Sequence, residues 1–480
     1  MEHSADGLEQ LSVVRRCFES GKTRSLSWRK SQLKALQRLL VEREKDIFRV
    51  LKEDLGKHQA EAFRDEVGFL GKSVDYHIAN LDKWVTPTKI SIPLLGFPSA
   101  AQLVQEPLGV VLVLSTWNFP IALSLEPLIG AISAGNAVVI KPSELAPSSS
   151  AFLATNIPLF MDNEAVKVIQ GGPDMGEKLL GHKWDKIFFT GSPRVGRVVM
   201  TAAAKHLTPV TLELGGKSPC IVDSISGSGD REVMVKRIIG GKWGSCNGQA
   251  CLAIDYLLVE EKFTTTLVDL LKTTMKTLVS EPEHISKIVN KHHFERLCSL
   301  LDDPLVASSV VHGGSINHEK MYIEPTILID PPLNSEIMVR EIFGPLLPII
   351  TLKKIEDSID FIKGRPKPLV IYAFTNNEAL KKKIVEETSS GGITFNDTLI
   401  QYVCDTIPFG GIGQSGFGKY HGKFSFDTFS HGKPVVRRSF LTEFSFRYPP
   451  WDEDKLQLLR YCYKFDYLRI ILHYLGLKKY

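Results

Sequence analysis

Apolar side chains recur every three or four positions along residues 33–51, among lysine, arginine and glutamate residues. Because an α-helix turns once in 3.6 residues, this spacing places the apolar side chains on one face and predicts helices here. The pattern ends near residue 84, and prolines and a glycine crowd the stretch that follows. Such residues break regular structure, so we expect an excursion or a boundary at 85–102.

Beyond this stretch, runs of consecutive apolar residues are separated by segments long enough to form helices. The runs lie at 110–114, 137–140, 166–169, 186–189, 220–222, 256–259, 347–350 and 371–374. Runs of this kind are typical of strands buried on both faces of a parallel sheet. The alternation predicts an α/β fold, with ligands at the loops that follow the strands. The pattern restarts after Glu213, which indicates a second domain.

The composition limits the cellular compartments and the kinds of binding partner that we expect for this chain. Lys and Arg number 58 against 54 Asp and Glu in 480 residues, so the balanced charge gives no reason to expect nucleic acid as a partner. Seven scattered cysteines without a Cys-x-x-Cys pair favour a reducing compartment over a disulfide framework. The amino-terminal residues are acidic, and no apolar run is long enough to span a bilayer. We therefore expect a cytoplasmic protein without a secretory signal.

Two residues offer catalytic chemistry. Cys251 ends the sequence NGQAC, and Glu213 lies within TLELGGK. A thiolate is a strong nucleophile and a carboxylate can act as a general base, so the pair suits an enzyme that forms a covalent intermediate and then hydrolyses it. A single cysteine is more often a small buried apolar side chain, so other motifs must decide.

Two glycine-containing segments compete as phosphate-binding loops. Residues 411–416 spell Gly-x-Gly-x-x-Gly, but no strand of useful length precedes them and Asp427 follows too closely for a dinucleotide fingerprint. We expect them to form a flexible loop. Residues 188–196 follow a predicted strand and lead into a predicted helix at 195–205. Free N–H groups at a helix start attract phosphate, so this segment is the better candidate, with a structural turn as the alternative.

Seven short motifs carry a resemblance to a known family. They are WNFP (117–120), KPSE (141–144), FTGS (189–192), ELGGK (213–217), GQAC (248–251), EIFGP (341–345) and PFGG (408–411). In these motifs and their order the chain resembles the NAD(P)-dependent aldehyde dehydrogenases, from about residue 10 to about residue 450. The short amino terminus and the sequence FSH at 429–431 are similar to the class 3 branch, and most of all to its plant members.

The resemblance implies an aldehyde dehydrogenase fold. Such a fold joins a Rossmann-like cofactor domain with a parallel sheet to a second α/β catalytic domain and a small oligomerisation element. The expected boundaries are 1–84 and 103–212 for the NAD(P)-binding domain, 213–424 for the catalytic domain, 85–102 and 425–446 for the oligomerisation element, and 447–480 for an amphipathic tail. Members of this class form homodimers, and we expect a strand added across subunits to hold this one together.

The resemblance also implies a reaction, the oxidation of medium- or long-chain aliphatic or aromatic aldehydes to carboxylic acids. Cys251 is expected to attack the aldehyde and form a thiohemiacetal, whose oxyanion is bound by the side chain of Asn118 and the N–H of Cys251. Loss of hydride leaves a thioester, and Glu213 activates the water that hydrolyses it. No metal site is expected.

The implied cofactor is NAD, with NADP as an alternative. The residues expected to bind it are Lys141, Glu144, Thr190, Gly191, Ser192, Gly196, Glu341 and Phe343. A carboxylate at Glu144 accepts hydrogen bonds from a free 2′-hydroxyl and repels a 2′-phosphate, which favours NAD. One departure from the family pattern is Arg340, which stands where a second acid usually precedes Glu341.

Two further features leave alternatives open. Cys246 lies five residues before Cys251, so it either forms a disulfide with Cys251 under oxidation or simply packs. The segment 451–480 mixes apolar side chains with arginine and lysine and is too charged to span a membrane. It is expected either to make a peripheral contact with an endomembrane or to dock on the protein's own surface.

Two other functions remain compatible with the fold. A related enzyme passes the thioester to coenzyme A, but Glu213 argues against this because deacylation by water is the step that needs such a base. A non-catalytic binding protein is disfavoured by the joint presence of Cys251, Glu213 and Asn118. NADH formation from a panel of aldehydes discriminates among these functions.

Overall fold

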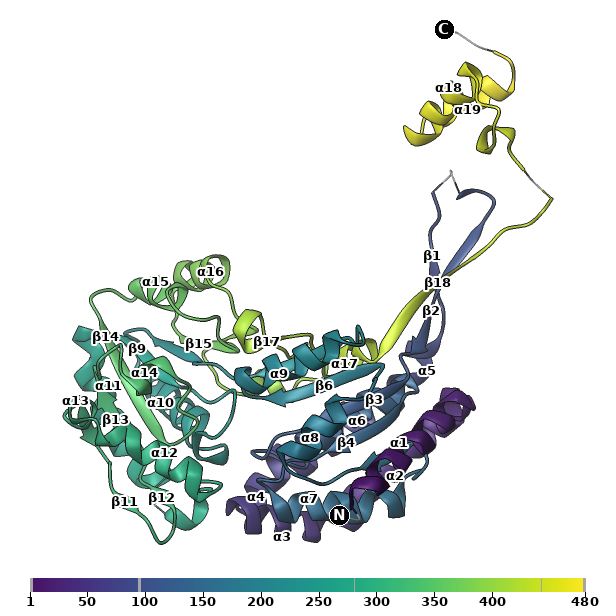
Figure 1. Ribbon diagram of the computed structural model, residues 1–480. Coiled ribbons are helices and arrows are strands. Elements are labelled where there is room, and N and C mark those ends of the chain that lie inside the picture. Colours follow the sequence, from purple (N-terminus) through teal and green to yellow (C-terminus); the bar gives the residue numbers. More distant parts are fainter. Residues whose placement is uncertain (1–2, 94–95, 280, 442, 478–480) are drawn as a thin grey trace. The chain divides into compact units, whose positions relative to one another are not determined.

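A computed structural model describes residues 3–93, 96–279, 281–441 and 443–477 (Figure 1). The described residues form two compact units. The larger unit comprises those up to Leu81 together with 107–429, and the smaller unit comprises those of 82–106 together with those from Ser430 onward. All the residues expected in catalysis and cofactor binding belong to the larger unit, which contains two extended sheets.

The first sheet of the larger unit has six strands in the order β17-β7-β6-β3-β4-β5. They are β3 (Val110–Leu114), β4 (Ala137–Lys141), β5 (Val166–Val168), β6 (Lys186–Gly191), β7 (Val210–Leu214) and β17 (Gly416–Phe417). Only β17 runs antiparallel to its neighbour. From β3 the chain builds outward to β4 and β5 and then returns to the other side of β3 with β6. The carboxyl ends of β3 and β6 therefore border the crevice where such sheets bind ligands.

Helices pack against this sheet, and their contacts show which of its side chains lie on the covered face. The helices of this region are α1 (His3–Glu19), α2 (Leu26–Glu42), α3 (Glu44–Leu55), α5 (Gly68–Val85), α6 (Ala122–Ala134), α7 (Pro147–Phe160), α8 (Pro173–Leu180), α9 (Pro193–Ala204) and α17 (Gly422–Thr428). Leu112, Phe189 and Leu212 share one core with residues of α1, α8 and α9. Because successive strand residues point to opposite faces, Thr190 and Glu213 project from the other face of the sheet.

The second sheet has seven strands in the order β10-β13-β14-β9-β8-β15-β16. They are β8 (Pro219–Val222), β9 (Tyr256–Glu260), β10 (Val310–His312), β13 (Thr326–Ile329), β14 (Leu346–Leu352), β15 (Val370–Phe374) and β16 (Gly392–Phe395). The helices of this region are α10 (Ser228–Lys242), α11 (Glu261–Leu278), α12 (Lys291–Asp302), α13 (Pro304–Ala307), α14 (Glu336–Val339), α15 (Asp357–Lys363) and α16 (Glu378–Glu387). A two-stranded ribbon, β11 (Ile316–Asn317) with β12 (Tyr322–Ile323), completes it.

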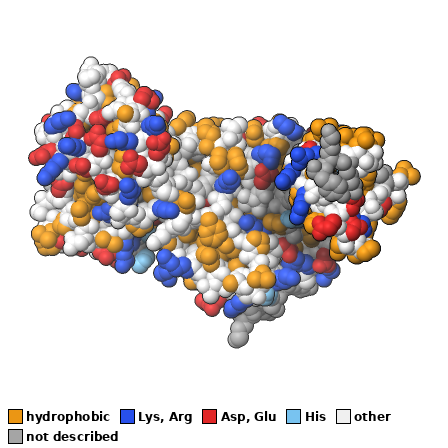
Figure 2. Space-filling view, turned by 90° about the horizontal axis from the view of Figure 1, so that it is seen from above, with side chains coloured by type: hydrophobic (Ala, Val, Ile, Leu, Met, Phe, Trp, Pro, Cys, Tyr) orange, Lys and Arg blue, Asp and Glu red, His pale blue; other side chains and the backbone are white. Residues whose placement is uncertain are grey.

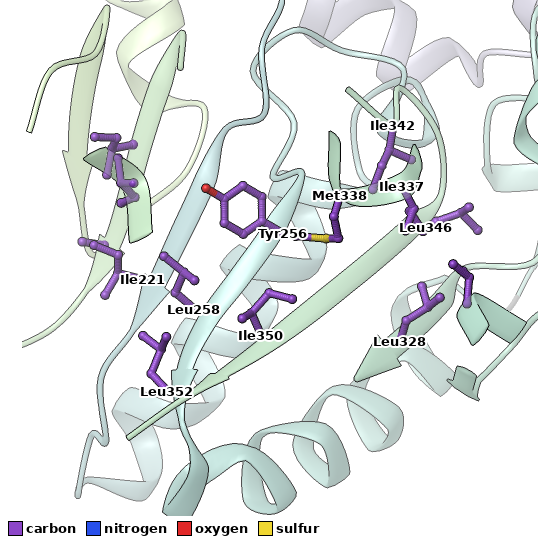
Figure 3. Packing of buried hydrophobic residues seen from close by; sticks show 14 of the residues in the cluster. Ile221, Tyr256, Leu258, Leu328, Ile337, Met338, Ile342, Leu346, Ile350 and Leu352 are labelled. Carbon is purple, nitrogen blue, oxygen red and sulfur yellow. The ribbon is translucent and has the colours of Figure 1, made fainter. Parts of the chain in front are cut away.

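The apolar core of the second sheet also holds a segment that matters for the site. In Figure 3, Leu258 of β9 and Ile350 of β14 lie in the same cluster as Met338 and Ile342. Met338 and Ile342 are completely buried. They flank Glu341, so the backbone that carries this residue is held by the core.

The expected strands are confirmed, since all eight apolar runs are strands of these two sheets. The helix expected at 195–205 is α9. Residues 411–416 differ from the expected loop, because Gly413–Ser415 form a 3₁₀ turn and Gly416 opens β17 opposite Glu213. Gly416 has φ 114°, and a Cβ there would overlap the carbonyl oxygen of Leu212. The spacing of these glycines thus serves a close strand pairing rather than a phosphate.

The smaller unit is a three-stranded sheet followed by two helices. Its elements are β1 (Thr88–Ile90), β2 (Ala100–Pro107), β18 (Ser430–Arg437), α18 (Glu453–Tyr463) and α19 (Tyr467–Tyr474), and the strand order is β1-β2-β18. The excursion expected at 85–102 contains β1 and the start of β2, and the strand expected near 425–446 is β18, which follows α17. The domain boundaries given above stay predictions. Among the described residues no helix combines the length and the apolar character needed to cross a membrane.

Candidate active site

A cavity of about 450 Å³ lies in the larger unit, next to the carboxyl ends of β6 and β7. Cys251, Glu213 and Thr190 line it together, although they come from three separate segments of the chain. Much of the remaining wall is apolar or aromatic and includes Phe69, Phe119, Leu123, Leu252, Phe409 and Tyr420. An apolar space with a few polar groups suits a small organic substrate.

Glu213 and Thr190 occupy paired positions on the neighbouring parallel strands β7 and β6. Both side chains are buried, and their side-chain oxygens have no hydrogen-bond partner among the described residues. Burial raises the pKa of Glu213 well above its ordinary value. Buried polar groups are normally hydrogen-bonded, so these oxygens are placed to meet groups that the polypeptide itself does not supply.

Cys251 follows a tight loop that begins where α10 ends. Cys246, Asn247 and Gly248 have φ values of 49°, 51° and 77°, so three consecutive residues adopt left-handed conformations. Such conformations are uncommon for residues other than glycine and are held only when their surroundings fix them. The loop therefore presents Cys251 at the cavity from a constrained backbone.

The thiol of Cys251 is partly buried and stands near two carboxyl groups. Burial, followed by Glu341 and then Glu213, raises the pKa of this thiol, while the N–H groups of Cys251 and Leu252 act in the opposite direction. The protonated thiol is thus the predominant form of Cys251, and nucleophilic attack requires a proton acceptor close by.

Asn118 lies in the segment after β3 and is tied to the loop that carries the thiol. Its Nδ2 donates to the carbonyl oxygen of Gln249 at 2.9 Å. The side chain of Gln249 in turn donates to the carbonyl oxygens of Cys246 and Lys287, each at 3.0 Å, and accepts from the N–H of Val289 at 3.1 Å. The predicted oxyanion donor and the predicted nucleophile are therefore linked through one hydrogen-bonded loop.

Cys246 is enclosed by the structure rather than presented to Cys251. Its side chain is fully buried in a cluster with Leu55, Trp117, Ala146 and Val289. Its Sγ lies 3.5 Å from the carbonyl oxygen of Asn118, and burial raises the pKa of its thiol. Of the two explanations that the spacing left open, this environment favours packing.

Glu341 reaches toward the same centre from the core of the second sheet. The N–H of Gly216 donates to its carboxylate, and a Cβ on Gly215 would overlap that carboxylate, so the LELGG motif makes room for it. Burial, followed by the charge of Asp255, raises the pKa of Glu341 to about 8. The guanidinium of Arg340, by contrast, is exposed and pairs with Glu336 at 2.7 Å.

The residues expected to bind a dinucleotide follow the carboxyl ends of β4 and β6. Lys141 Nζ pairs with the Glu144 carboxylate at 2.8 Å. Ser192 caps α9 by accepting from the N–H of Val195 at 3.4 Å, which leaves this helix start at the crevice. A Cβ on Gly191 would overlap the ring of Phe189, so the backbone stays bare where a phosphate would approach.

Two other predicted cofactor residues have structural explanations as well. Gly196 lies in the first turn of α9, where a Cβ would come within 2.9 Å of Leu214, so glycine allows the helix to pack closely on β7. Phe343 packs edge-on against Trp117, with ring centroids 5.3 Å apart. Together with Thr190 and Glu213, whose buried oxygens have no hydrogen-bond partner in the described part of the chain, the residues present fit a nicotinamide dinucleotide.

Sequence reasoning missed several charged residues around this centre. Lys57 and Glu66 form a completely buried ion pair. Lys242 ends α10 with a buried ammonium that has no hydrogen-bond partner in the described part of the chain, and burial lowers its pKa to about 8. Arg64 and Asp65 line the cavity. None of these residues belongs to one of the seven motifs. The sequence marks only Lys242 as unusual, as a charged residue within an apolar stretch.

Comparisons with known proteins agree with this geometry. The sequence model of the aldehyde dehydrogenase family matches residues 9–435. "Aldehyde dehydrogenase family 3 member F1" of Arabidopsis thaliana is 56% identical over 475 residues, covering 98% of each chain. An aldehyde dehydrogenase of Craterostigma plantagineum is 44% identical, covering 96% of this chain and 97% of its own. The substrate-bound structure of Staphylococcus aureus AldH superimposes with a TM-score of 0.91 at 38% identity, covering 95% of this chain and 99% of its own.

The expected fold and the expected resemblance are thus both confirmed, down to the class 3 plant members. The chain belongs to the aldehyde dehydrogenase family, and it is an oxidoreductase that converts aldehydes to carboxylic acids.

Proposed function

We propose that the protein oxidises its aldehyde through a covalent intermediate on Cys251. The observation that carries this proposal is the shared cavity, in which Cys251 and Glu213 face the same space while Asn118 is bonded to the loop of Cys251 through Gln249. In the balanced reaction, an aldehyde, water and NAD(P)⁺ become a carboxylic acid, NAD(P)H and a proton.

In the first step the carboxylate of Glu213, which lines the same cavity, takes the proton of the Cys251 thiol and releases it to solvent. The sulfur bonds to the aldehyde carbon as the C=O π bond opens, and the oxygen takes up negative charge. The side-chain amide of Asn118 and the N–H of Cys251 donate hydrogen bonds to this oxygen. Asn118 Nδ2 otherwise donates to the carbonyl oxygen of Gln249, so it exchanges a neutral acceptor for a charged one. The donor is in place before the charge develops, which is the condition for lowering the barrier.

NAD(P)⁺, when bound, supplies the acceptor for the hydride that leaves the aldehyde carbon. Lys141 and Glu144 would hold its adenosine ribose, and the carboxylate of Glu144 favours NAD. Gly191 and Ser192 would face its phosphates at the start of α9. Glu341 and Phe343 would contact the nicotinamide side.

Glu213 then removes a proton from the water that attacks the thioester on Cys251. Its raised pKa makes it an effective base once ionised, and both oxygens lack partners among the described residues, so they remain free for water. The thiol of Cys251 departs and the carboxylic acid is released. A buried base at this place favours hydrolysis over transfer of the acyl group to coenzyme A.

The cavity wall supports medium- or long-chain aliphatic and aromatic aldehydes as substrates. Aromatic side chains such as Phe119, Phe409 and Tyr420 form much of it, so binding gains from the apolar surface that the substrate buries. At about 25 cal/mol per Å², each added methylene stabilises the complex by about 0.8 kcal/mol until the cavity is filled.

The test is NADH absorbance with a series of aliphatic aldehydes of increasing length and an aromatic aldehyde. We expect NADH from the wild-type protein and none from Cys251→Ala, with KM falling as the chain lengthens. Absence of NADH from the wild-type protein across the whole series would refute the proposed function.

We further propose a homodimer held by the smaller unit. β18 is an edge strand of the three-stranded sheet, and an exposed edge offers unpaired backbone groups to a second strand. Light scattering after size exclusion measures the mass of the particle. A monomer at working concentration contradicts this proposal and leaves the catalytic one untouched.

We also propose a cytoplasmic enzyme whose tail makes peripheral contact with membranes. Figure 2 shows hydrophobic side chains gathered over the C-terminal helices, where Leu468, Ile471 and Leu475 are exposed beside Arg469. Exposed apolar and basic side chains on one short helix suit the interface of an anionic bilayer. Flotation with phosphatidylserine vesicles compares the full chain with residues 1–450. Equal flotation of the two would exclude the tail as an anchor.

A further inference from the structure

A completely buried ion pair lies behind the segment that carries Asn118. Lys57 comes two residues after the end of α3. Glu66 belongs to η2 (Phe63–Val67), a π-helical turn between α4 (Gln59–Ala62) and α5. Their charged groups are 2.6 Å apart, and the exposure of both side chains is 0%. The proposed catalytic steps use neither residue.

Among the described residues, the further side-chain hydrogen bonds of this pair lead to the segment after β3. Lys57 Nζ donates to the carbonyl oxygen of Asn118 at 2.9 Å, and its ammonium lies 4.2 Å from the ring centroid of Phe119. The second oxygen of Glu66 accepts from the N–H groups of Ile121 and Ala122, at 2.9 Å and 3.1 Å. The pair therefore holds the backbone of Asn118 at one end and the start of α6 at the other.

Stability alone gives little reason to bury two charges here. Desolvation opposes both, and well-packed apolar side chains of the same volume usually serve the fold as well. Burial works against the charge on Lys57, but the attraction of Glu66 and other carboxylates prevails and raises the pKa of Lys57 to about 12. The ammonium of Lys57 is therefore favoured in the fold, and it donates to the carbonyl oxygen of Asn118.

The short segment around Glu66 also holds the loop of the nucleophile. Glu61 accepts from the N–H of Cys246 at 2.6 Å, and Asp65 accepts from the hydroxyl of Ser245 at 2.8 Å. A π-helical turn inserts one residue into a helix and re-aims the side chains around it. In this chain the turn directs one carboxylate toward the segment after β3 and a second toward the Cys251 loop.

We propose that Lys57 and Glu66 are positioning residues that set the place of Asn118 for binding the oxyanion. They act through the backbone of Asn118, while its side-chain amide touches the reacting oxygen. This inference rests on the proposed role of Asn118 as the oxyanion donor. Because a donor displaced by about 1 Å can cost about 10²-fold in rate, loss of either partner lowers turnover without contacting the substrate.

The first measurement is kcat/KM for a medium-chain aldehyde in Lys57→Met and Glu66→Gln. We expect each to fall about 10- to 100-fold, mainly through kcat, because neither side chain is among the residues that line the aldehyde cavity. The doubly neutral variant Lys57→Met/Glu66→Leu leaves no unpaired buried charge, so it stays measurable if the single variants fold poorly. Lys22→Met removes a lysine that pairs with Asp162 at 2.7 Å on the surface, and it serves as the matched control with unchanged kcat/KM.

The second measurement is the rate at which iodoacetamide alkylates Cys251. This displacement uses the same sulfur but forms no oxyanion, so a positioning role leaves it within about twofold of the wild-type rate. Mass spectrometry of the modified peptide assigns the alkylation to Cys251, because Cys404 is also partly exposed and unfolding would expose the buried cysteines. A parallel fall of alkylation and turnover would mean that the pair merely supports the fold, and the proposal would be wrong.

The third measurement repeats the pair variants in an Asn118→Ala background. If the pair acts through Asn118, its loss has no further effect there, whereas independent effects multiply. Multiplying effects, or unchanged turnover in all pair variants while Asn118→Ala is slow, would overturn the inference alone. Unchanged kcat/KM in Asn118→Ala by itself would instead remove the proposed role of Asn118, so the two failures are distinct.

Discussion

On one side of the cavity, the anchored side (Lys57, Glu66, Asn118 and Gln249), hydrogen bonds and an ion pair tie the side chains to the backbone of neighbouring segments. On the open side (Thr190 and Glu213), buried oxygens have no partner among the described residues. Apart from Asn118 Oδ1, which is buried without a partner among the described residues, the polar side-chain groups of the anchored side are bonded and hold their geometry before a substrate arrives. The open side is completed only by what enters the cavity. The anchored side thus supplies a fixed geometry, and the open side supplies polar groups that are free to bind what enters the cavity.

The largest expected effect comes from the open side, in Glu213→Gln. The amide can accept neither the proton of the Cys251 thiol nor that of water, so we expect the rate of NADH formation to fall about 10²- to 10⁴-fold below wild type. The unfolding free energy should stay about equal, because glutamine replaces a carboxyl whose oxygens have no partner among the described residues with an amide of the same size. Stopped-flow absorbance and urea unfolding measure the two quantities. A destabilised variant would show that Glu213 belongs to the anchored side.

The anchored side should give the opposite pattern in Gln249→Ala. This change leaves the carbonyl of Lys287 and the N–H of Val289 buried without their bonds, so we expect the unfolding free energy to fall by about 1–3 kcal/mol. Urea unfolding at neutral pH checks the value. An unfolding free energy equal to that of the wild-type protein would contradict the contrast between the anchored side and the open side.

Glu341 tests the contrast through pH, since it stands between the two extremes with one backbone partner, Gly216. Its pKa is about 8 in the folded protein and 4.5 ordinarily, so the unfolded chain loses this proton first as pH rises. Stability should therefore fall between these values, by up to ~1.4 kcal/mol per pH unit from this group. We expect Glu341→Gln to flatten that decline in melting temperature. A decline as steep as that of wild type would contradict the raised pKa.

The smallest effect is expected from Cys246→Ser. Since Cys246 is enclosed by apolar side chains behind Asn118, peroxide should inactivate wild type and variant to the same irreversible extent. Activity before and after treatment with dithiothreitol measures the recoverable fraction. More recovery in wild type than in the variant would restore the redox explanation for this cysteine.

The sequence predicted the strands and the meeting of Cys251 with Glu213, because apolar runs and short motifs are local signals. It also placed Glu341 at the site, and the structure shows the LELGG glycines making room for this carboxylate. It missed Lys57 and Glu66, because their meaning depends on a contact with Asn118 from a distant part of the chain. Residues 411–416 misled for the same reason, since Gly416 pairs with Glu213 on the distant strand β7.

The pairing of β17 with β7 has a consequence for biosynthesis. The edge of the strand that carries Glu213 is closed by Gly416 and Phe417, which leave the ribosome about 200 residues later. Until then Glu213 belongs to an uncapped sheet edge, and contacts of such large sequence separation form slowly. The sheet edge at Glu213, the proposed base, is therefore closed only when almost the whole chain has been made. A truncated or stalled product that ends before β17 contains Cys251 but lacks the strand that closes the sheet at Glu213, so we expect it to be inactive.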